Sequence, residues 1–125
     1  MVEIIAEIAN AHQGNAFTAF KLAKAAKAAG ADAVKFQIYF AEDFISKDHS
    51  RFNHFKNQSF SKIQWKKIIK ETKKIGIKIY CDVLGEQAFK LAESLKIDGY
   101  KIHSSDVSNK KLLNKISKQN KKVFL

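Results

Sequence analysis

A chain of 125 residues and 14.2 kDa has room for one domain with one hydrophobic core, which argues against a two-domain enzyme or a repeat array. Its 46% hydrophobic and 28% charged residues are typical of an ordinary globular protein. No apolar run approaches the roughly 18 residues of a membrane span, and the acidic start MVEIIAEIAN is unlike a secretory signal. Together with the single Cys81, these features predict a cytoplasmic protein without a membrane partner.

The positive charge is concentrated in the second half of the chain. The formal net charge is +11, of which residues 1–60 contribute +1 and residues 61–125 contribute +10. Most of these cations fall at helical spacing, and all except Arg51 are Lys, whereas readout of nucleic-acid bases favours Arg. We therefore expect solvated lysine faces on outer helices and no nucleic-acid partner, with a basic polyanion-binding module as an alternative.

Short strand-like runs alternate with longer amphipathic segments along the chain. Residues 4–8 and 33–39 have strand patterns, and the strong helix formers of residues 17–29 lie between them and end at Gly30. Residues 40–60 show no sustained period and predict a long loop. Ser61 then opens a second alternation, with helices over 62–75, 86–96 and from Asn109, and with strands over 77–84, 100–105 and 122–125.

The candidate core follows from the apolar positions of these segments. In the helix over 62–75, Ile63, Ile68 and Ile69 lie near one face. Trp65 and the phenylalanines of the predicted helices are also expected to be buried, because large apolar side chains contribute most to a core.

Alternating strands and helices predict right-handed βαβ units and a parallel sheet covered by helices. Two architectures of this α/β class compete. Five such units in this length suit a flavodoxin-like doubly wound sheet, and the same units also suit the first half of a TIM-type (β/α)8 barrel, which needs about 250 residues. Length by itself favours the doubly wound sheet.

A receiver domain of the phosphorelay type is one doubly wound candidate. Asp82 ends the third predicted strand, and hydroxyl and Lys residues follow at the fourth and fifth. Such a site also needs a pair of acids after the first strand to hold Mg²⁺, and Glu7 is the one acid there. A nucleotide site is excluded as well, because the five glycines form neither a dinucleotide-binding nor a phosphate-binding loop motif.

Three strings resemble motifs of the N-acetylneuraminate (sialic acid) synthase family. AEIANAHQGN resembles the family's A-E-I-G-x-N-H-x-G, AGADAVKFQIYFAED its A-G-A-D-A-V-K-F-Q-x-x-x-A-E-D, and YKIHSSDVSNKKLL its Y-K-I-x-S-x-D-x-x-N-x-x-L-L. Order and spacing agree along the whole chain. The resemblance implies that residues 1–125 are the N-terminal part of a TIM-type barrel, an incomplete domain truncated at strand five.

The resemblance also implies a reaction. Members of this family condense phosphoenolpyruvate with N-acetylmannosamine or a related N-acetylated amino sugar to give a sialic-type acid. The positions that match phosphoenolpyruvate contacts are Lys35, Gln37, Lys101 and Ser104, and Glu7 matches an acid that handles protons. Ammonium groups and hydroxyl donors held by a rigid sheet suit a trianionic substrate. All five positions lie toward the C-terminal ends of predicted strands, where barrel active sites are built.

Further expectations concern groups outside this chain. The family's divalent metal, Mn or Mg, is held by two His from later strands, so the resemblance assigns no metal ligand to these residues. It also implies that the full-length form is a homodimer and that the chain alone does not turn over substrates.

The chain departs from the family's pattern at one telling position. Asp82 stands where the family has Thr, and a carboxylate there repels a bound phosphate unless it points elsewhere, pairs with Lys101 or marks a changed substrate. His103, two residues after Lys101, is a hydrogen-bonded interior His or a substrate contact. Ser105 and Asp106 are candidate caps for the helix that starts near Asn109.

Two alternatives remain open for the lysines. Lys35 and Lys101 lie inside apolar strands, where an ammonium needs an anion, so an internal salt bridge to Glu7 or Asp82 competes with phosphate binding. A Schiff-base aldolase on the same barrel, with Lys101 as its nucleophile, is the alternative enzyme.

Overall fold

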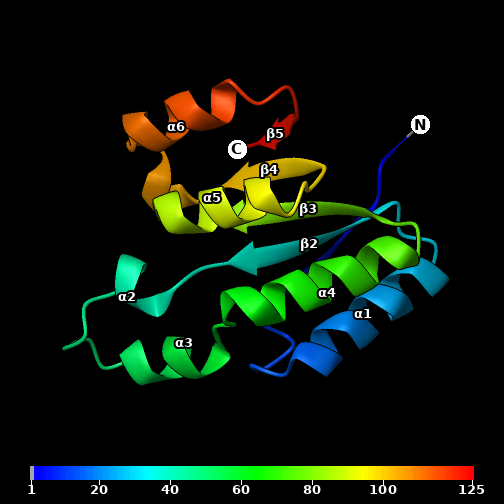
Figure 1. The fold of residues 1–125 in the computed structure, drawn as a ribbon, viewed down its shortest axis with the longest axis horizontal. Coiled ribbons are helices and arrows are strands. Elements are labelled where there is room, and N and C mark those ends of the chain that lie inside the picture. Colours follow the sequence, from blue (N-terminus) through cyan, green and yellow to red (C-terminus); the bar gives the residue numbers. More distant parts are fainter. Residues whose placement is uncertain (1) are drawn as a thin grey trace.

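The computed structural model describes residues 2–125 as five strands that alternate with helices (Figure 1). In chain order the elements are β1 (Ile5–Ala9), α1 (Ala16–Ala28), β2 (Ala33–Ile38), α2 (Ala41–Phe44), α3 (Phe52–Gln58), α4 (Lys62–Lys74), β3 (Lys78–Val83), α5 (Gly85–Ser94), β4 (Gly99–Ile102), the 3-10 turn η1 (Ser104–Asp106), α6 (Lys110–Ser117) and β5 (Lys122–Phe124). The predicted alternation of strands and helices is confirmed.

All five strands are parallel and lie in the order β1-β2-β3-β4-β5. Each strand therefore pairs with the next one along the chain, without the reversal of strand order that defines a doubly wound sheet. A sheet that always advances in one direction is the arrangement of a (β/α)8 barrel. The strand order thus selects the barrel over the doubly wound alternative that length favoured.

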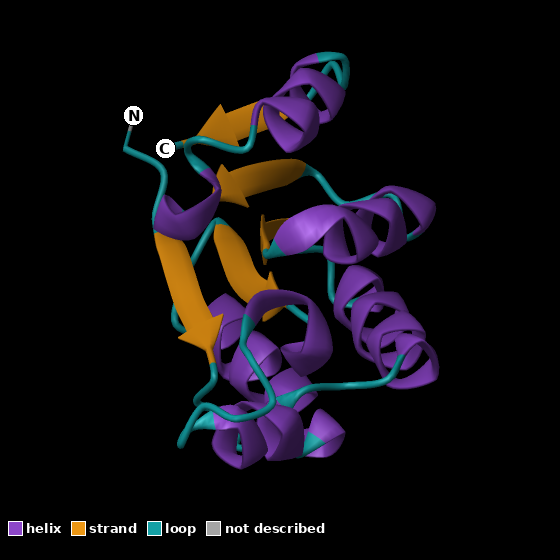
Figure 2. Ribbon diagram, turned by 90° about the vertical axis from the view of Figure 1, so that its left-hand side faces the viewer, coloured by secondary structure: helices purple, strands orange, loops and turns teal. Residues whose placement is uncertain are grey.

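The sheet has one apolar face and one polar face. Val34, Phe36, Ile79, Cys81 and Tyr100 are fully buried and belong to the hydrophobic core. This face is covered by the helices, which gather on one side of the sheet (Figure 2). The alternate residues of the same strands point to the opposite face, which therefore carries the polar side chains.

Local signals set the helix ends as expected. Ser61 caps α4 in a reciprocal capping box, in which its side chain accepts from the Gln64 backbone N–H and the Gln64 side chain accepts from the Ser61 N–H. Gly30 and Gly76 follow the last residues of α1 and α4 with φ of +90° and +67°, the left-handed conformation that ends many helices.

The expectation of a long loop over residues 40–60 is wrong. The segment contains α2 and α3, which are too short to show a helical period in the sequence. They are held by an aromatic cluster of Tyr39, Phe44 and Phe55, with ring centroids 5.0 to 6.1 Å apart. Tertiary packing, rather than helical pattern, orders this segment.

Two predicted core residues lie at the surface instead. Trp65, Ile68 and Ile69 are buried as expected, but Ile63 is 80% exposed in the first turn of α4 and Phe17 is 68% exposed in the first turn of α1. Both side chains lie in the first turn of a helix and outside the stripe of side chains that faces the sheet. No helix in the described part of the chain has the length and apolar character needed to cross a membrane.

Candidate functional site

The sheet register brings the predicted site residues onto the polar face. One row across the strands contains Glu7, Lys35 and Tyr80, and the next row, nearer the C-terminal ends, contains Gln37, Asp82 and Lys101. Residues paired across a ladder point to the same side of a sheet. Five of the seven candidate residues are therefore brought together on one surface by four neighbouring strands.

Glu7 and Lys35 form an ion pair between β1 and β2. The Lys35 side chain is 16% exposed and that of Glu7 is 49% exposed. Glu7 Oε1 also accepts a hydrogen bond from the Ala9 backbone N–H at 3.1 Å, where β1 bulges against β2. The internal salt bridge that competes with phosphate binding is therefore present, and an anionic ligand has to compete with Glu7 for Lys35.

Asp82 is a buried carboxylate in the second row. It is 6% exposed, and its Oδ1 has no hydrogen-bond partner among residues 2–125. Burial raises the pKa of Asp82, while the positive charges of Lys35, His103 and Lys101 act in the opposite direction. The register places the side chain on the polar face, in the same row as Gln37 and Lys101.

Lys101 is the register partner of Asp82 but directs its ammonium elsewhere. Its Nζ donates a hydrogen bond to the Ile102 carbonyl oxygen at 2.5 Å. No ion pair in the described chain involves Asp82, so the Asp82–Lys101 salt bridge, one of the three alternatives for this carboxylate, is not formed. Lys101 consequently carries a half-buried positive charge on the polar face without a carboxylate partner in residues 2–125.

The chain turns immediately after β4, so Ser104 lies in a turn and not in a strand as the sequence predicted. This residue is exposed at the start of η1 and lies outside the strand that the sequence predicted through residue 105. His103 caps the turn, with its Nδ1 2.8 Å from the Ser105 Oγ. His103 is hydrogen-bonded, but it is only partly buried at the C-terminal edge of the polar face, so it is not the interior His that one of the two sequence expectations described.

Asp106 does not cap α6. Asn109 is the N-cap, and its Oδ1 accepts from the Leu112 N–H. The Asp106 carboxylate accepts instead from the Gly85 N–H at 3.2 Å and from the Asn109 side-chain amide at 3.0 Å. It therefore ties the turn after β4 to the start of α5 beside the candidate site.

Sequence reasoning missed the opposite end of the polar face. The Tyr80 hydroxyl donates to Glu3 Oε1 at 2.6 Å, and Glu3 also forms ion pairs with Lys78 and Lys122. These contacts lower the pKa of Glu3 to about 2, mainly through Lys122. Alternation along β3 places Tyr80 on the same face as Asp82, but no sequence signal connects Tyr80 to Glu3.

Residues 2–125 do not assemble a metal centre. No group of three or more His, Cys, Asp or Glu side chains within residues 2–125 is arranged to hold a metal ion. Within these residues the structure therefore identifies no set of side chains that could hold the divalent cation implied by the resemblance.

Comparisons with known proteins agree on one family. The sequence profile of the NeuB family matches residues 22–125. An uncharacterized protein from Methanocaldococcus jannaschii is 35% identical over 98% of this chain and 36% of its own length. The N,N'-diacetyllegionaminic acid synthase of Campylobacter jejuni is 30% identical over 98% of this chain and 41% of its own length.

A solved structure shows the same fold. The N-acetylneuraminic acid (sialic acid) synthetase from Leptospira borgpetersenii superposes with a TM-score of 0.89 at 25% identity, covering 98% of this chain and 43% of that one. The chain thus spans less than half the length of the relatives it matches. With a profile match over residues 22–125 and a TM-score of 0.89 to that synthetase, the chain belongs to the NeuB family.

Proposed function

We propose that this chain forms the phosphoenolpyruvate-binding part of an enzyme that condenses phosphoenolpyruvate with N-acetylmannosamine or a related N-acetylated amino sugar. The observation that carries the proposal is the placement of Lys35 and Lys101 on one polar face, in a chain that belongs to the NeuB family. Relatives named as a legionaminic acid synthase and a sialic acid synthetase support a sialic-type product.

The polar face suits a small trianion. Two ammonium groups from β2 and β4 supply charge-assisted hydrogen bonds to phosphate and carboxylate oxygens. Gln37, two residues after Lys35 on β2, supplies an amide donor, and Ser104 supplies a hydroxyl at the turn after β4. Rigid strands hold the backbone of most of these groups, while the side chain of Lys35 has to exchange its ion pair with Glu7 for the anion.

In the proposed reaction, C3 of phosphoenolpyruvate attacks the aldehyde carbon of the sugar, forming the new C–C bond. Water then adds to C2, the C2–O bond to the phosphate breaks, and phosphate leaves with that oxygen. The products are a 2-keto acid of the sialic type and inorganic phosphate. Glu7 is proposed to exchange a proton with the reacting groups, since binding of the anion at Lys35 frees its carboxylate from the ion pair.

The divalent cation has no assigned step in this proposal. Its ligands would have to come from outside residues 1–125, because no suitable cluster lies in the described chain. The full-length protein is proposed to act as a homodimer, and the present chain is expected to bind phosphoenolpyruvate without turnover.

Binding of phosphoenolpyruvate tests the proposal directly. Titration followed by ¹H–¹⁵N NMR should shift the amides around Lys35 and Lys101, with a dissociation constant that rises about tenfold or more in Lys35→Gln and in Lys101→Gln. Lys96→Gln is the matched control, because Lys96 is an exposed lysine after α5. Equal affinities in all four proteins would contradict the proposal.

A second measurement separates the proposal from the aldolase. Borohydride reduction in the presence of pyruvate leaves a covalent adduct only if a lysine forms a Schiff base. We expect no adduct, and an adduct at Lys101 would overturn phosphoenolpyruvate condensation in favour of the aldolase.

A further inference from the structure

Helices α1 and α4 carry most of the net charge of the protein. They lie side by side on the outside of the sheet (Figure 1). Together they contain nine Lys and one Glu, a net charge of +8 out of +11 for the whole chain. This surface is on the helical side of the sheet, opposite the polar face, so it is independent of the proposed phosphoenolpyruvate site.

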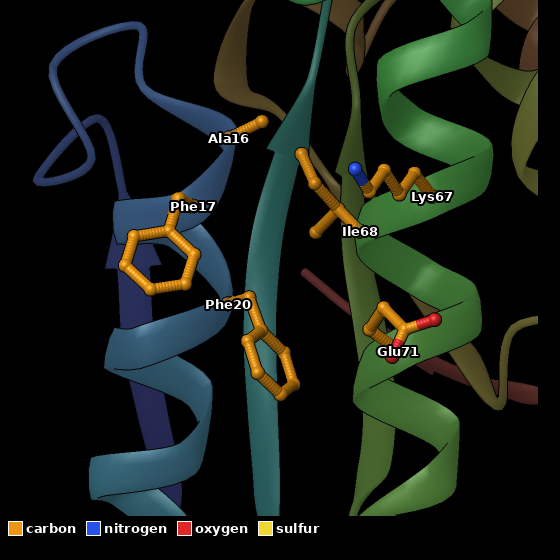
Figure 3. Close-up of a pocket in the computed structure, with 6 residues that line it drawn as sticks. All are labelled: Ala16, Phe17, Phe20, Lys67, Ile68 and Glu71. Carbon is orange, nitrogen blue, oxygen red and sulfur yellow. The ribbon is translucent and has the colours of Figure 1, made fainter.

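An apolar groove runs between the two helices at the centre of this charge. It has a volume of about 330 Å³ and is lined by Ala16, Phe17, Phe20, Lys67, Ile68 and Glu71. Figure 3 shows the rings of Phe17 and Phe20 projecting from α1, with Lys67, Ile68 and Glu71 on the facing side of α4. Phe17 is exposed and Phe20 is partly buried, and contiguous apolar surface of this kind is a feature of protein interaction sites.

The apolar surface extends beyond the groove itself. Phe17 is 68% exposed, and Ile63, one turn before Lys67 on the same stripe of α4, is 80% exposed. Each leaves apolar surface in contact with water, and removal of such surface from water contributes favourably to the free energy of binding. A partner that covers both would recover that contribution.

The lysines around the groove have almost no acidic partners. Lys74 pairs with Glu71, and no other lysine of α1 or α4 forms an ion pair within residues 2–125. The Lys21 ammonium lies 5.4 Å from the centre of the Phe17 ring, at the edge of the groove. An apolar centre with an unneutralised basic rim is complementary to an apolar stripe flanked by carboxylates.

We propose that the groove between α1 and α4 binds an acidic amphipathic helix of a partner protein. The groove is lined over residues 16–20 of α1 and 67–71 of α4, about one turn of each helix, which suits the apolar side chains of one or two turns of a third helix. Apolar side chains of that helix pack against Phe17, Phe20 and Ile68, and its carboxylates pair with the surrounding lysines. A nucleic acid would use the lysines but has no side chains for the apolar groove.

A synthetic peptide tests the proposal on the whole chain. The probe is a fluorescein-labelled peptide of 16 residues with Leu on one helical face and Glu elsewhere, followed by fluorescence anisotropy. Its matched control is a peptide of the same composition in which the Leu residues are scrambled around the helix. We expect the amphipathic peptide to bind at least about tenfold more tightly than the scrambled peptide, because only the first presents a continuous apolar stripe.

Variants then assign the binding to this groove. Phe17→Ser and Lys67→Glu should each weaken the amphipathic peptide about fivefold or more, and both positions are solvent-accessible enough for the fold to remain intact. Val107→Ser and Lys118→Glu change an exposed apolar residue and an exposed lysine elsewhere, and should leave the affinity unchanged. Circular dichroism confirms that all four variants are folded.

Three results would overturn the proposal. The first is equal affinity for the two peptides, and the second is an equal effect of groove and control variants. The third is complete competition by heparin at the same charge concentration, which would identify a surface for polyanions in general. None of these results bears on phosphoenolpyruvate binding at Lys35 and Lys101, so failure of either proposal is distinguishable from failure of the other.

Discussion

Glu3 and Lys122 form an ion pair although 119 positions separate them in the sequence. Lys122 begins β5 at one edge of the sheet, and Glu3 precedes β1 at the other edge. Four inter-strand spacings separate these edges, about 19 Å in a flat sheet. Residues before β1 therefore run across the uncovered face toward β3 and β5, and Glu3 closes the N-terminal end of that face.

The Tyr80 hydroxyl holds the Glu3 carboxylate through a hydrogen bond. Tyr80→Phe removes the hydroxyl that donates to Glu3 Oε1 but retains the buried ring. We expect the free energy of unfolding to fall by about 1.5 kcal/mol, the usual contribution of a hydrogen bond to a charged group. Urea denaturation at pH 7 measures the change. Unchanged stability would show that Glu3 does not rely on Tyr80.

The ion pairs of Glu3 also make the stability of the protein depend on pH. The pKa of Glu3 is lowered to about 2 in the folded state, mainly by Lys122. Its contribution to stability is therefore complete above the unfolded pKa of 4.5 and is lost as the pH falls from 4.5 toward 2. Over this range Glu3→Gln should lose less stability than the unmodified protein, and parallel pH profiles would contradict the ion-pair cluster.

His12 predicts a loss of stability at a higher pH. It is 1% exposed, packs on the Phe60 ring at 4.4 Å and accepts from the Gly14 N–H through Nδ1. Burial lowers the pKa of His12 from 6.5 to about 4, so the unfolded chain takes up a proton that the folded chain excludes. Stability is full above pH 6.5 and falls by roughly 3 kcal/mol as the pH drops to 4.

Urea denaturation at pH 7.5 and pH 5 measures this effect where carboxylates contribute least. The free energy of unfolding should fall between pH 7.5 and pH 5. This slope should flatten in His12→Gln and persist in His54→Gln, which changes an exposed histidine of α3. A slope that disappears in both variants, or in neither, would contradict the assignment to His12.

Gly14 predicts a large effect of a single methyl group. Its φ is +74°, and a Cβ built on it would lie 2.3 Å from the Asn57 carbonyl oxygen, so the loop after β1 closely approaches the end of α3. Gly14→Ala should lower the free energy of unfolding by about 3 kcal/mol, from backbone strain and the clash together.

Gly76→Ala is the matched control for this substitution. Gly76 has a similar φ of +67° but nothing within 4 Å of an added Cβ, so only the backbone cost of about 1 kcal/mol is expected. Thermal or chemical denaturation of the two variants isolates the steric contribution, and equal effects would show that the close approach to Asn57 is unimportant.

Replacement of the buried Asp82 carboxylate is expected to raise the free energy of unfolding rather than lower it. Burial raises the pKa of Asp82 above its usual 3.8, so the ionised form is penalised in the folded state and the penalty develops as the pH rises above 3.8. Asp82→Asn should therefore raise the free energy of unfolding at pH 7 and raise it by less at pH 4. Asp48→Asn, at an exposed position, should change neither value.

The same variant bears on the proposed substrate. A neutral amide in place of the carboxylate removes repulsion of a phosphate near Lys35 and Lys101, so Asp82→Asn should bind phosphoenolpyruvate severalfold more tightly. Weaker binding in Asp82→Asn would instead indicate that the carboxylate itself contacts the ligand.

Several features were readable from local sequence because they depend on neighbouring residues. Period-2 alternation placed Val34, Phe36 and Ile38 on one side of their strand and Lys35 and Gln37 on the other, and the structure confirms that the three apolar side chains are buried. The capping signal of Ser61 marked the start of α4 correctly. By contrast, the short α2 and α3 left no periodic pattern, since their order depends on contacts of Phe44 and Phe55 with Tyr39.

The amino-acid sequence by itself determined the alternation of strands and helices, the helix ends and the residues that face the polar side, because hydrogen bonding and side-chain direction within an element are local. Motif order also pointed to the family, and the profile match bears it out. The tertiary structure decided the strand order, and with it the barrel over the doubly wound sheet. It also decided that Lys35 pairs with Glu7 while Asp82 stays unpaired, and that Glu3 reaches Lys122. These outcomes depend on the distances between segments far apart in the chain, which only the packed sheet sets.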